Sequence, residues 1–152
     1  ALDMALHCPD SMTAVVRLFN DLTPAKLDCL GDIYSPGIVF RDPVFEVRGL
    51  ARLREVLSRR LDQIGGITVK LLDAHGDDHT GFLLWVLKYT HQGESREIHG
   101  TSHFKFAADG RISEQQDHWD ASFPIYGEYP LLGWLLRQIK QRVQLTPEKS
   151  GR

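Results

Sequence analysis

The chain contains little of what marks several common classes of protein. Its 152 residues include two cysteines, Cys8 and Cys29, which are too few for a disulfide framework and lack the neighbouring ligands of a zinc site. No apolar run approaches the roughly 18 residues that a membrane-spanning helix needs. The formal net charge is -2, so the basic surface of a nucleic-acid-binding protein is not expected. No glycine-rich loop offers a phosphate site, and we expect neither a nucleotide cofactor nor a metal ion.

These absences favour a protein of a reducing compartment. Unpaired cysteines persist where thiols stay reduced, and the first residues, Ala1–His7, lack the basic start of a signal peptide. We therefore expect a cytoplasmic chain with no nucleic-acid partner and no membrane association.

Three helices are predicted in the first part of the chain, where apolar residues recur at helical spacing. The first begins at Ser11, the second begins at Thr23-Pro24 and has Tyr34 in its apolar face, and the third covers about residues 50–64. The outer face of the third helix carries arginines interleaved with acids, which indicates an ordinary solvated surface. These arginines are Arg52, Arg54, Arg59 and Arg60.

From Gly65-Gly66 onward the apolar spacing changes to two, which predicts strands. Strands joined by short turns are expected at about 67–71, 82–90, 97–106 and 111–121. Helices followed by an antiparallel meander indicate an α+β fold in which a curved, cone-shaped sheet wraps around the N-terminal helices.

A very apolar segment after Pro130 predicts an additional C-terminal helix that packs on the domain or on a partner, with attachment to an anionic membrane surface as the alternative. We expect four parts along the chain, namely an N-terminal extension over 1–10, one domain over 11–123, the C-terminal helix over 124–145 and a frayed tail over 146–152.

Side-chain alternation along the strands predicts an aromatic pocket on the inner face of the sheet. Asp117 shares its face with Gln115 and Trp119, which places a carboxylate beside an indole. Gly100 is expected opposite Asp117, where it leaves room for a small hydrophobic ligand. The inward sets on the two preceding strands are Leu83, Trp85, Leu87 and Tyr89, and Ile98, Gly100, Ser102, Phe104 and Phe106.

Four short motifs occur in an order and spacing that resemble a known superfamily. They are Phe40–Val44, Arg48–Leu50, Phe104–Phe106 with Asp109–Ile112, and Gln116–Asp120. Over roughly residues 11 to 123 the chain resembles the nuclear transport factor 2-like superfamily, in its SnoaL-like and ketosteroid-isomerase-like branch. The resemblance implies the cone fold, but that fold hosts isomerases, cyclases, hydrolases and non-catalytic modules.

Carried over residue by residue, the resemblance implies an incomplete set of catalytic groups. Asp42 matches the general base of ketosteroid isomerases. The tyrosine that donates to the oxyanion there would fall near Leu18 or Phe19, and Ser102 stands where a protonated acid is expected, which disfavours steroid isomerisation. Asp117 matches an acid–base aspartate of limonene epoxide hydrolase-like proteins and of polyketide cyclases. The accompanying arginine and aspartate of the hydrolases have no counterparts near Trp85.

Each of these residues also has a structural interpretation. Asp42 before proline is typical of a turn, and Asp117 could lie on the surface or pair with Arg111 or His99. Trp119 and Tyr89 are compatible with plain core positions as well as with a ligand site.

Three functional hypotheses follow. The first is a cofactor-independent isomerase, cyclase or hydrolase that acts on a small hydrophobic metabolite, with Asp117 and Asp42 as catalytic residues. Its substrate-binding residues would be Trp119, Trp85, Phe104, Tyr89, Ser102 and Phe19. The second is a pocket that binds such a ligand without chemistry. The third is an interaction module, a homodimer through the outer sheet face that carries His99, Thr101 and His103, and whether the chain is an enzyme is left open.

Overall fold

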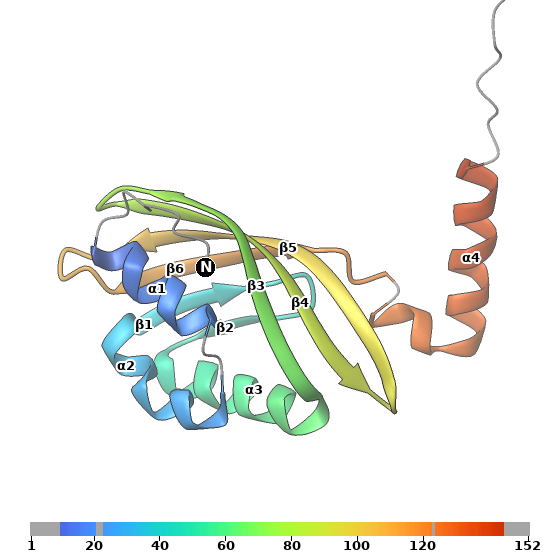
Figure 1. Ribbon diagram of the computed structural model, residues 1–152, viewed down its shortest axis with the longest axis horizontal. Coiled ribbons are helices and arrows are strands. Elements are labelled where there is room, and N and C mark those ends of the chain that lie inside the picture. Colours follow the sequence, from blue (N-terminus) through green and yellow to red (C-terminus); the bar gives the residue numbers. More distant parts are fainter. Residues whose placement is uncertain (1–9, 21–22, 123, 145–152) are drawn as a thin grey trace, which may run out of the picture. The chain divides into compact units, whose positions relative to one another are not determined.

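The structure, a computed structural model, describes residues 10–20, 23–122 and 124–144 (Figure 1). The chain divides into two compact units, Ala1–Trp119 and Asp120–Arg152. The first unit contains a curved, unclosed sheet and the helices that lie on its concave side, and this arrangement confirms the predicted α+β class.

The sheet has six strands in the order β2-β1-β6-β5-β4-β3. Their bounds are β1 Tyr34–Arg41, β2 Glu46–Arg48, β3 Gly65–Gly76, β4 Thr80–His91, β5 Glu94–Phe106 and β6 Ile112–Trp119. The predicted meander is therefore present as β3 to β6. A two-residue turn at Gln92-Gly93, where both residues have positive φ, joins β4 to β5. Such a turn has a twist that matches the strands it connects.

One pair in the sheet, β1 with β6, is parallel, whereas the sequence predicts antiparallel pairing throughout. The difference follows from the order of the elements. The chain leaves β1, forms β2, a helix and the meander, and then returns beside β1 in the same direction, as a parallel pair requires. This pairing brings the end of β1 level with the middle of β6.

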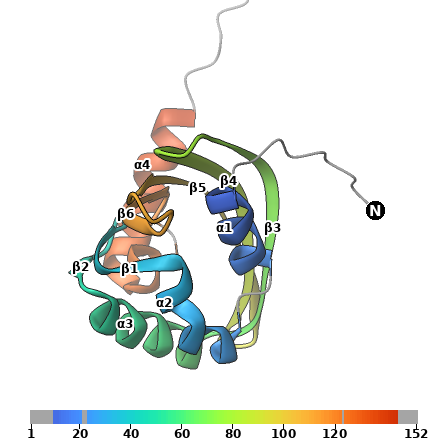
Figure 2. The ribbon, with the colours of Figure 1, turned by 90° about the vertical axis from the view of Figure 1, so that its left-hand side faces the viewer.

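The helices of the first unit are α1 (Asp10–Asn20), η1 (Pro24–Cys29), α2 (Leu30–Ile33) and α3 (Leu50–Gln63). Figure 2 shows α1, α2 and α3 inside the curve of the sheet. Their apolar residues, among them Met12, Val15 and Leu53, join inward-facing strand residues in one hydrophobic core. Burial of this face is the main stabilising contribution to such a layered fold.

The predicted second helix ends earlier than its apolar spacing suggests. Tyr34 does not continue the helix but is the first residue of β1, and its side chain is buried. A short 3-10 turn and a four-residue helix replace the longer helix that the pattern predicts. Tertiary pairing with β6, where Tyr34 lies opposite Ile112, overrides the local helical preference.

The second unit contains η2 (Tyr126–Glu128) and α4 (Pro130–Gln144). Gly133 packs so closely on the backbone of Gly127 that a Cβ at this position would lie 2.3 Å from the Gly127 carbonyl oxygen. Six large apolar side chains of α4 are exposed: Leu131, Leu132, Trp134, Leu135, Ile139 and Val143. The prediction that this helix covers its apolar face on the domain or on a partner stays a prediction. Within the described residues, no helix combines the length and hydropathy needed to cross a bilayer.

Candidate functional site

The candidate site lies on the inner face of the sheet where β5 and β6 pair. Ser102 of β5 lies opposite Asp117 of β6. The Ser102 hydroxyl donates a hydrogen bond of 2.6 Å to Oδ1 of Asp117, and Nε2 of Gln115 donates a second bond of 2.9 Å to the same oxygen. Ser102 and Gln115 are both buried, and Asp117 is partly buried.

Two further side chains continue these hydrogen bonds outward from the carboxylate. Nε1 of Trp85 on β4 donates to Oγ of Ser102 at 2.9 Å, and the Tyr34 hydroxyl on β1 donates to Oε1 of Gln115 at 2.7 Å. We call Tyr34, Gln115, Asp117, Ser102 and Trp85 the Asp117 network. It joins four adjacent strands through side chains alone.

Burial raises the pKa of Asp117 from 3.8 to about 6, against the two hydrogen bonds, which lower it. The charge of Asp42 raises the pKa further and that of Arg60 lowers it, by smaller amounts. Burial also raises the pKa of Tyr34, with a further contribution from the charge of Asp117, so Tyr34 stays a neutral phenol. Desolvation is therefore the main cause of the raised pKa of Asp117, because the site does not fully replace the water that the ionised carboxylate would bind.

Asp42 lies beside Asp117 because of the parallel pairing of β1 and β6. Arg41, the last residue of β1, pairs with Gln116, so Asp42, the first residue after β1, comes close enough to Asp117 for its charge to affect the Asp117 pKa. They share the inner face, because Asp42 follows buried Phe40 by two residues along the chain. The structure thus brings the two predicted catalytic aspartates together.

Asp42 is already engaged by its surroundings. Its Oδ1 accepts hydrogen bonds from the backbone N–H groups of Val44 and Phe45, at 2.8 and 2.9 Å, which is the turn geometry typical of aspartate before proline. Its Oδ2 lies 2.8 Å from Nη1 of Arg60, in the geometry of an ion pair rather than of a hydrogen bond. The Arg60 guanidinium also lies over the Phe45 ring, 4.2 Å from its centroid.

The prediction that Arg60 belongs to a plain solvated helix face is wrong. The side chain of Asp42 is 1% exposed, and a buried carboxylate needs a charged partner. Arg54 also departs from the prediction, because it donates to the Leu27 carbonyl. Arg52 and Arg59 both pair with Glu55 on the exposed face, as the interleaved charges indicate.

The predicted aromatic residues lie near the Asp117 network to different degrees. Trp85 is part of it. Trp119 is partly buried, one inward position along β6 from Asp117, and Phe104 is one inward position along β5 from Ser102. Tyr89 is buried on β4, two inward positions from Trp85. Phe19 lies in α1, but its side chain is outside the described part of the structure.

The prediction that Gly100 faces Asp117 and leaves room for a ligand is wrong. Gly100 lies opposite Trp119, and an added Cβ would lie 2.4 Å from the ring of Trp85. The glycine therefore makes room for the Trp85 indole rather than for a ligand. Ser113 is an extra residue on β6, between the pairs Phe106–Ile112 and Lys105–Glu114, and it brings Ser102 rather than Thr101 opposite Asp117. Such a bulge shifts every later pair.

Three residues of the site were not predicted as functional: Tyr34, Gln115 and Arg60. Gln115 had the clearest signal, since it alternates onto the face of Asp117. Tyr34 and Arg60 were assigned to helix faces, and only the tertiary structure brings them to the site.

The outer face of the same strands carries the histidines, as the alternation predicts. His99 is exposed and bonds Glu97, and neither Arg111 nor His99 pairs with Asp117. His103 stacks on Phe82 with ring centroids 4.4 Å apart. Across the described residues no cluster of His, Cys, Asp or Glu has the arrangement of a metal site.

With this geometry in place, comparison with known proteins identifies the family. The pattern of the SnoaL-like domain matches residues 15–115. The chain belongs to the SnoaL-like domain family. The matched stretch contains the Asp42 turn, Arg60, Ser102 and Gln115 and ends two residues before Asp117. No curated protein matches this chain.

Several solved structures share the fold. An LEH-like epoxide hydrolase of M. tuberculosis has a TM-score of 0.62 at 21% identity, over 88% of this chain and 94% of that one. A protein of Jannaschia sp. CCS1 described as a SnoaL-like polyketide cyclase has a TM-score of 0.64 at 15% identity, over 72% and 85%. A hypothetical protein of Catenulispora acidiphila has a ketosteroid isomerase-like fold and was solved in complex with trimethylamine. Its TM-score is 0.63 at 15% identity, over 75% of this chain and 88% of that one. At these identities the likeness concerns the fold alone.

Proposed function

We propose that the chain is a cofactor-independent enzyme that transfers a proton on a small, largely apolar metabolite, with Asp117 as the acid or base. The observation that carries this proposal is the position of Asp117, a partly buried carboxyl whose pKa is raised to about 6. A carboxyl that titrates close to neutral pH is present in both forms at working pH, which general acid–base catalysis requires.

The surroundings of Asp117 support a substrate that is apolar over most of its surface. Trp85, Phe104 and Trp119 lie on the same inner face, and hydrogen-bonding groups are concentrated around the carboxylate. Such an arrangement orients one polar group of a ligand and packs against the rest. Proton transfer of this kind serves isomerases, cyclases and epoxide hydrolases, the activities named among proteins that share the fold.

We assign Asp42 a weaker part in the chemistry. Both of its oxygens are engaged, by two backbone N–H groups and by Arg60. It therefore acts on the reaction mainly through its charge, which raises the pKa of the neighbouring Asp117. A direct proton transfer by Asp42 remains the alternative for this residue.

The experiment is turnover of a panel of terpenoid epoxides, polyketide-like enones and steroids, with binding measured in parallel. Asp117→Asn keeps the shape and hydrogen bonds of the side chain but cannot exchange a proton. We expect it to lower turnover by at least about 100-fold while affinity stays within about tenfold. Asp42→Asn should lower turnover less. The matched control is Asp109→Asn, the same change at an exposed hairpin carboxylate, which should keep full turnover. Full turnover in Asp117→Asn would remove this residue from the mechanism.

A binding protein without chemistry is the second candidate, and the aromatic side chains that share the inner face with Asp117 would serve it equally well. In that case both aspartate variants change affinity and no product appears with any member of the panel.

An interaction module is the third candidate, and it is compatible with either of the others. The outer face of β4 exposes Phe82 and Leu84 by 52% and 41%, and Phe82 stacks on His103 of β5. We propose that this face forms a homodimer. Light scattering at tens of micromolar should give the mass of two chains, and Phe82→Lys should give the mass of one. A monomeric mass for the unchanged chain would contradict the proposal.

A further inference from the structure

The two oxygens of the Asp117 carboxylate have different surroundings. Both hydrogen bonds that the side chain receives, from Ser102 and from Gln115, end on Oδ1. Among the described residues, Oδ2 receives no hydrogen bond and takes part in no ion pair. A proton that binds to Oδ1 therefore has two hydrogen-bond donors beside it, whereas a proton that binds to Oδ2 has none.

The orientation of the Gln115 amide decides whether Oδ1 faces a donor or an acceptor. An amide can present its NH2 group or its oxygen to a neighbour, because the two ends have nearly the same shape. Here Nε2 points to Asp117 and Oε1 points to Tyr34. If the amide were reversed, its oxygen would face the carboxylate and repel it in the ionised state.

Tyr34 holds the amide in the observed orientation. Its side chain is buried, and its hydroxyl donates to Oε1 of Gln115 at 2.7 Å. No other described acceptor bonds this hydroxyl, so a reversed amide would leave a buried O–H group without a partner. Burial also raises the pKa of Tyr34, which keeps the hydrogen on the hydroxyl. The phenol is thus a fixed donor at the far end of the network.

We propose that Tyr34 is a positioning residue that acts through Gln115. It keeps Oδ1 of Asp117 a permanent hydrogen-bond acceptor, and it leaves Oδ2 as the atom that carries the exchangeable proton. On the other side, Trp85 donates to Oγ of Ser102 and leaves the Ser102 hydrogen for Oδ1. This inference rests on the proposed role of Asp117 in catalysis, and it specifies the oxygen that faces the substrate in that role.

The test measures the pKa of Asp117 directly, by carbon-13 NMR of labelled aspartate carboxyl groups in the full chain. Gln115→Met removes the donor at similar volume and should raise the pKa by about one. Tyr34→Phe should raise it in the same direction by a smaller amount, because the released amide can turn its oxygen toward a protonated Asp117. Tyr89→Phe, which also removes the phenol hydroxyl of a buried tyrosine on the inner face, should leave the pKa of Asp117 unchanged.

The charged groups around Asp117 stay the same in all of these variants. Asp42 from the loop after β1 and Arg60 from α3 both affect its pKa, and neither contacts the substituted side chains in any hydrogen bond or ion pair of the described residues. A change in Tyr34→Phe and not in Tyr89→Phe is therefore a change transmitted through Gln115. A merely structural role of Tyr34 would lower stability and leave the pKa of Asp117 where it is.

A folded Tyr34→Phe protein with the same Asp117 pKa as Tyr89→Phe would overturn the proposal. If Tyr34→Phe does not fold, the proposal is tested instead by a pH titration of the unchanged protein. The side-chain NH2 resonance of Gln115 should then shift with pH at the same midpoint as the Asp117 carboxyl, and a flat resonance would overturn the proposal. These readouts need no substrate, so they remain decisive if the panel of metabolites gives no turnover. If turnover is found, its pH profile should move with the Asp117 pKa in Tyr34→Phe.

Discussion

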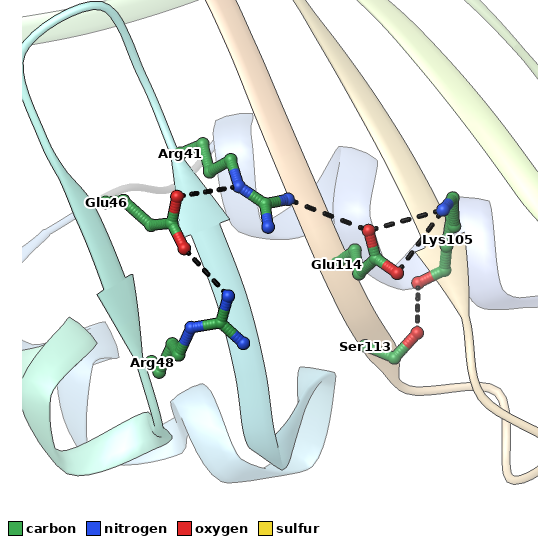
Figure 3. Close-up of polar contacts among 6 residues, drawn as sticks. All are labelled: Arg41, Glu46, Arg48, Lys105, Ser113 and Glu114. Atoms are coloured by element: carbon green, nitrogen blue, oxygen red, sulfur yellow. Dashed lines mark hydrogen bonds and ion pairs between the residues drawn. The ribbon is translucent and has the colours of Figure 1, made fainter.

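Over strands β2, β1, β6 and β5, the outer face of the sheet carries exposed ion pairs, whereas the inner face carries a carboxylate among neutral groups. On the outer face, exposed side chains of both signs alternate from Arg48 through Glu46, Arg41 and Glu114 to Lys105, with N–O distances from 2.9 to 3.8 Å (Figure 3). We call these residues the outer ladder. On the inner face the same strands hold Tyr34, Gln115 and Asp117, with neutral partners hydrogen-bonded to a single carboxylate.

The comparison shows that burial controls the pKa of the inner carboxyl, whereas cationic hydrogen-bond donors control the pKa of the outer one. Hydrogen bonds from Arg41, the largest cause, and from Arg48 lower the pKa of Glu46 on the outer face. Asp117 also receives two hydrogen bonds, yet burial outweighs them and raises its pKa to about 6. Glu46 therefore stays charged at neutral pH, and the inner carboxyl is free to change its protonation state.

The largest expected effect tests whether the inner face is the stabilising one. Phe104 is fully buried in the core, and its replacement by alanine should cost about 3–5 kcal/mol of unfolding free energy. Lys105→Ala, at the neighbouring outward position, should change stability by less than about 0.5 kcal/mol. Urea unfolding of both variants measures this difference. Equal losses would mean that the two faces do not differ in burial as the structure describes.

Asp117→Asn should make the protein more stable at pH 8. Between pH 4 and 6 the folded chain keeps a proton on Asp117 that the unfolded chain has lost, so stability falls as the pH rises through this window. The difference between about 6 and 3.8 corresponds to about 3 kcal/mol. Asparagine avoids this cost and keeps an oxygen for both donors.

The measurement for this variant is urea unfolding as a function of pH. The stability gain should shrink as the pH falls from 6 and disappear below about 4. A constant difference between variant and unchanged protein at all pH values would show that ionisation of Asp117 is not its cause.

Arg60→Gln should have an intermediate effect. It leaves Asp42, whose side chain is 1% exposed, without its charged partner, although the two backbone N–H groups remain. We expect a loss of about 1–3 kcal/mol, below the full cost of breaking a buried ion pair because Arg60 is itself 36% exposed. Arg59→Gln, one residue earlier on α3 and paired with exposed Glu55, is the matched control and should show almost no loss. A similar loss in both variants would return Arg60 to the solvated face that its sequence context suggests.

The smallest effect belongs to the outer ladder. Glu46→Gln removes the carboxylate that joins Arg41 and Arg48, but all three side chains remain in contact with water. The melting temperature should stay within the error of calorimetry at 0.15 M salt. A clear drop that vanishes at 1 M salt would show that the ladder stabilises the sheet more than exposed pairs usually do.

The sequence predicts the fold better than the site because each fold signal is local. Alternation on β4 and β5 places Trp85, Ser102 and Phe104 on the inner face, and their burial confirms it. The same alternation puts Asp117 with Gln115. Both results depend only on the period of a strand.

The contacts within the site depend on long-range register, which alternation does not contain. The extra residue Ser113 sets Ser102 rather than Thr101 opposite Asp117, and Oγ of Ser113 donates a hydrogen bond to the Lys105 carbonyl beside the bulge (Figure 3). Tyr34 has helical spacing in the sequence, but its partner, Gln115, is 81 residues away. No local pattern indicates either fact.

Titration of the carboxyl groups by carbon-13 NMR, in the unchanged protein, tests the central claim most directly. It observes both faces of the sheet in one experiment and requires neither a substrate nor a variant. We expect Asp117 to titrate with a pKa of about 6, while the pKa of Glu46 lies below its ordinary value of 4.5. An Asp117 pKa at or below 3.8 would contradict the account, because burial would then not outweigh the two hydrogen bonds and the carboxyl would not change its protonation state near neutral pH.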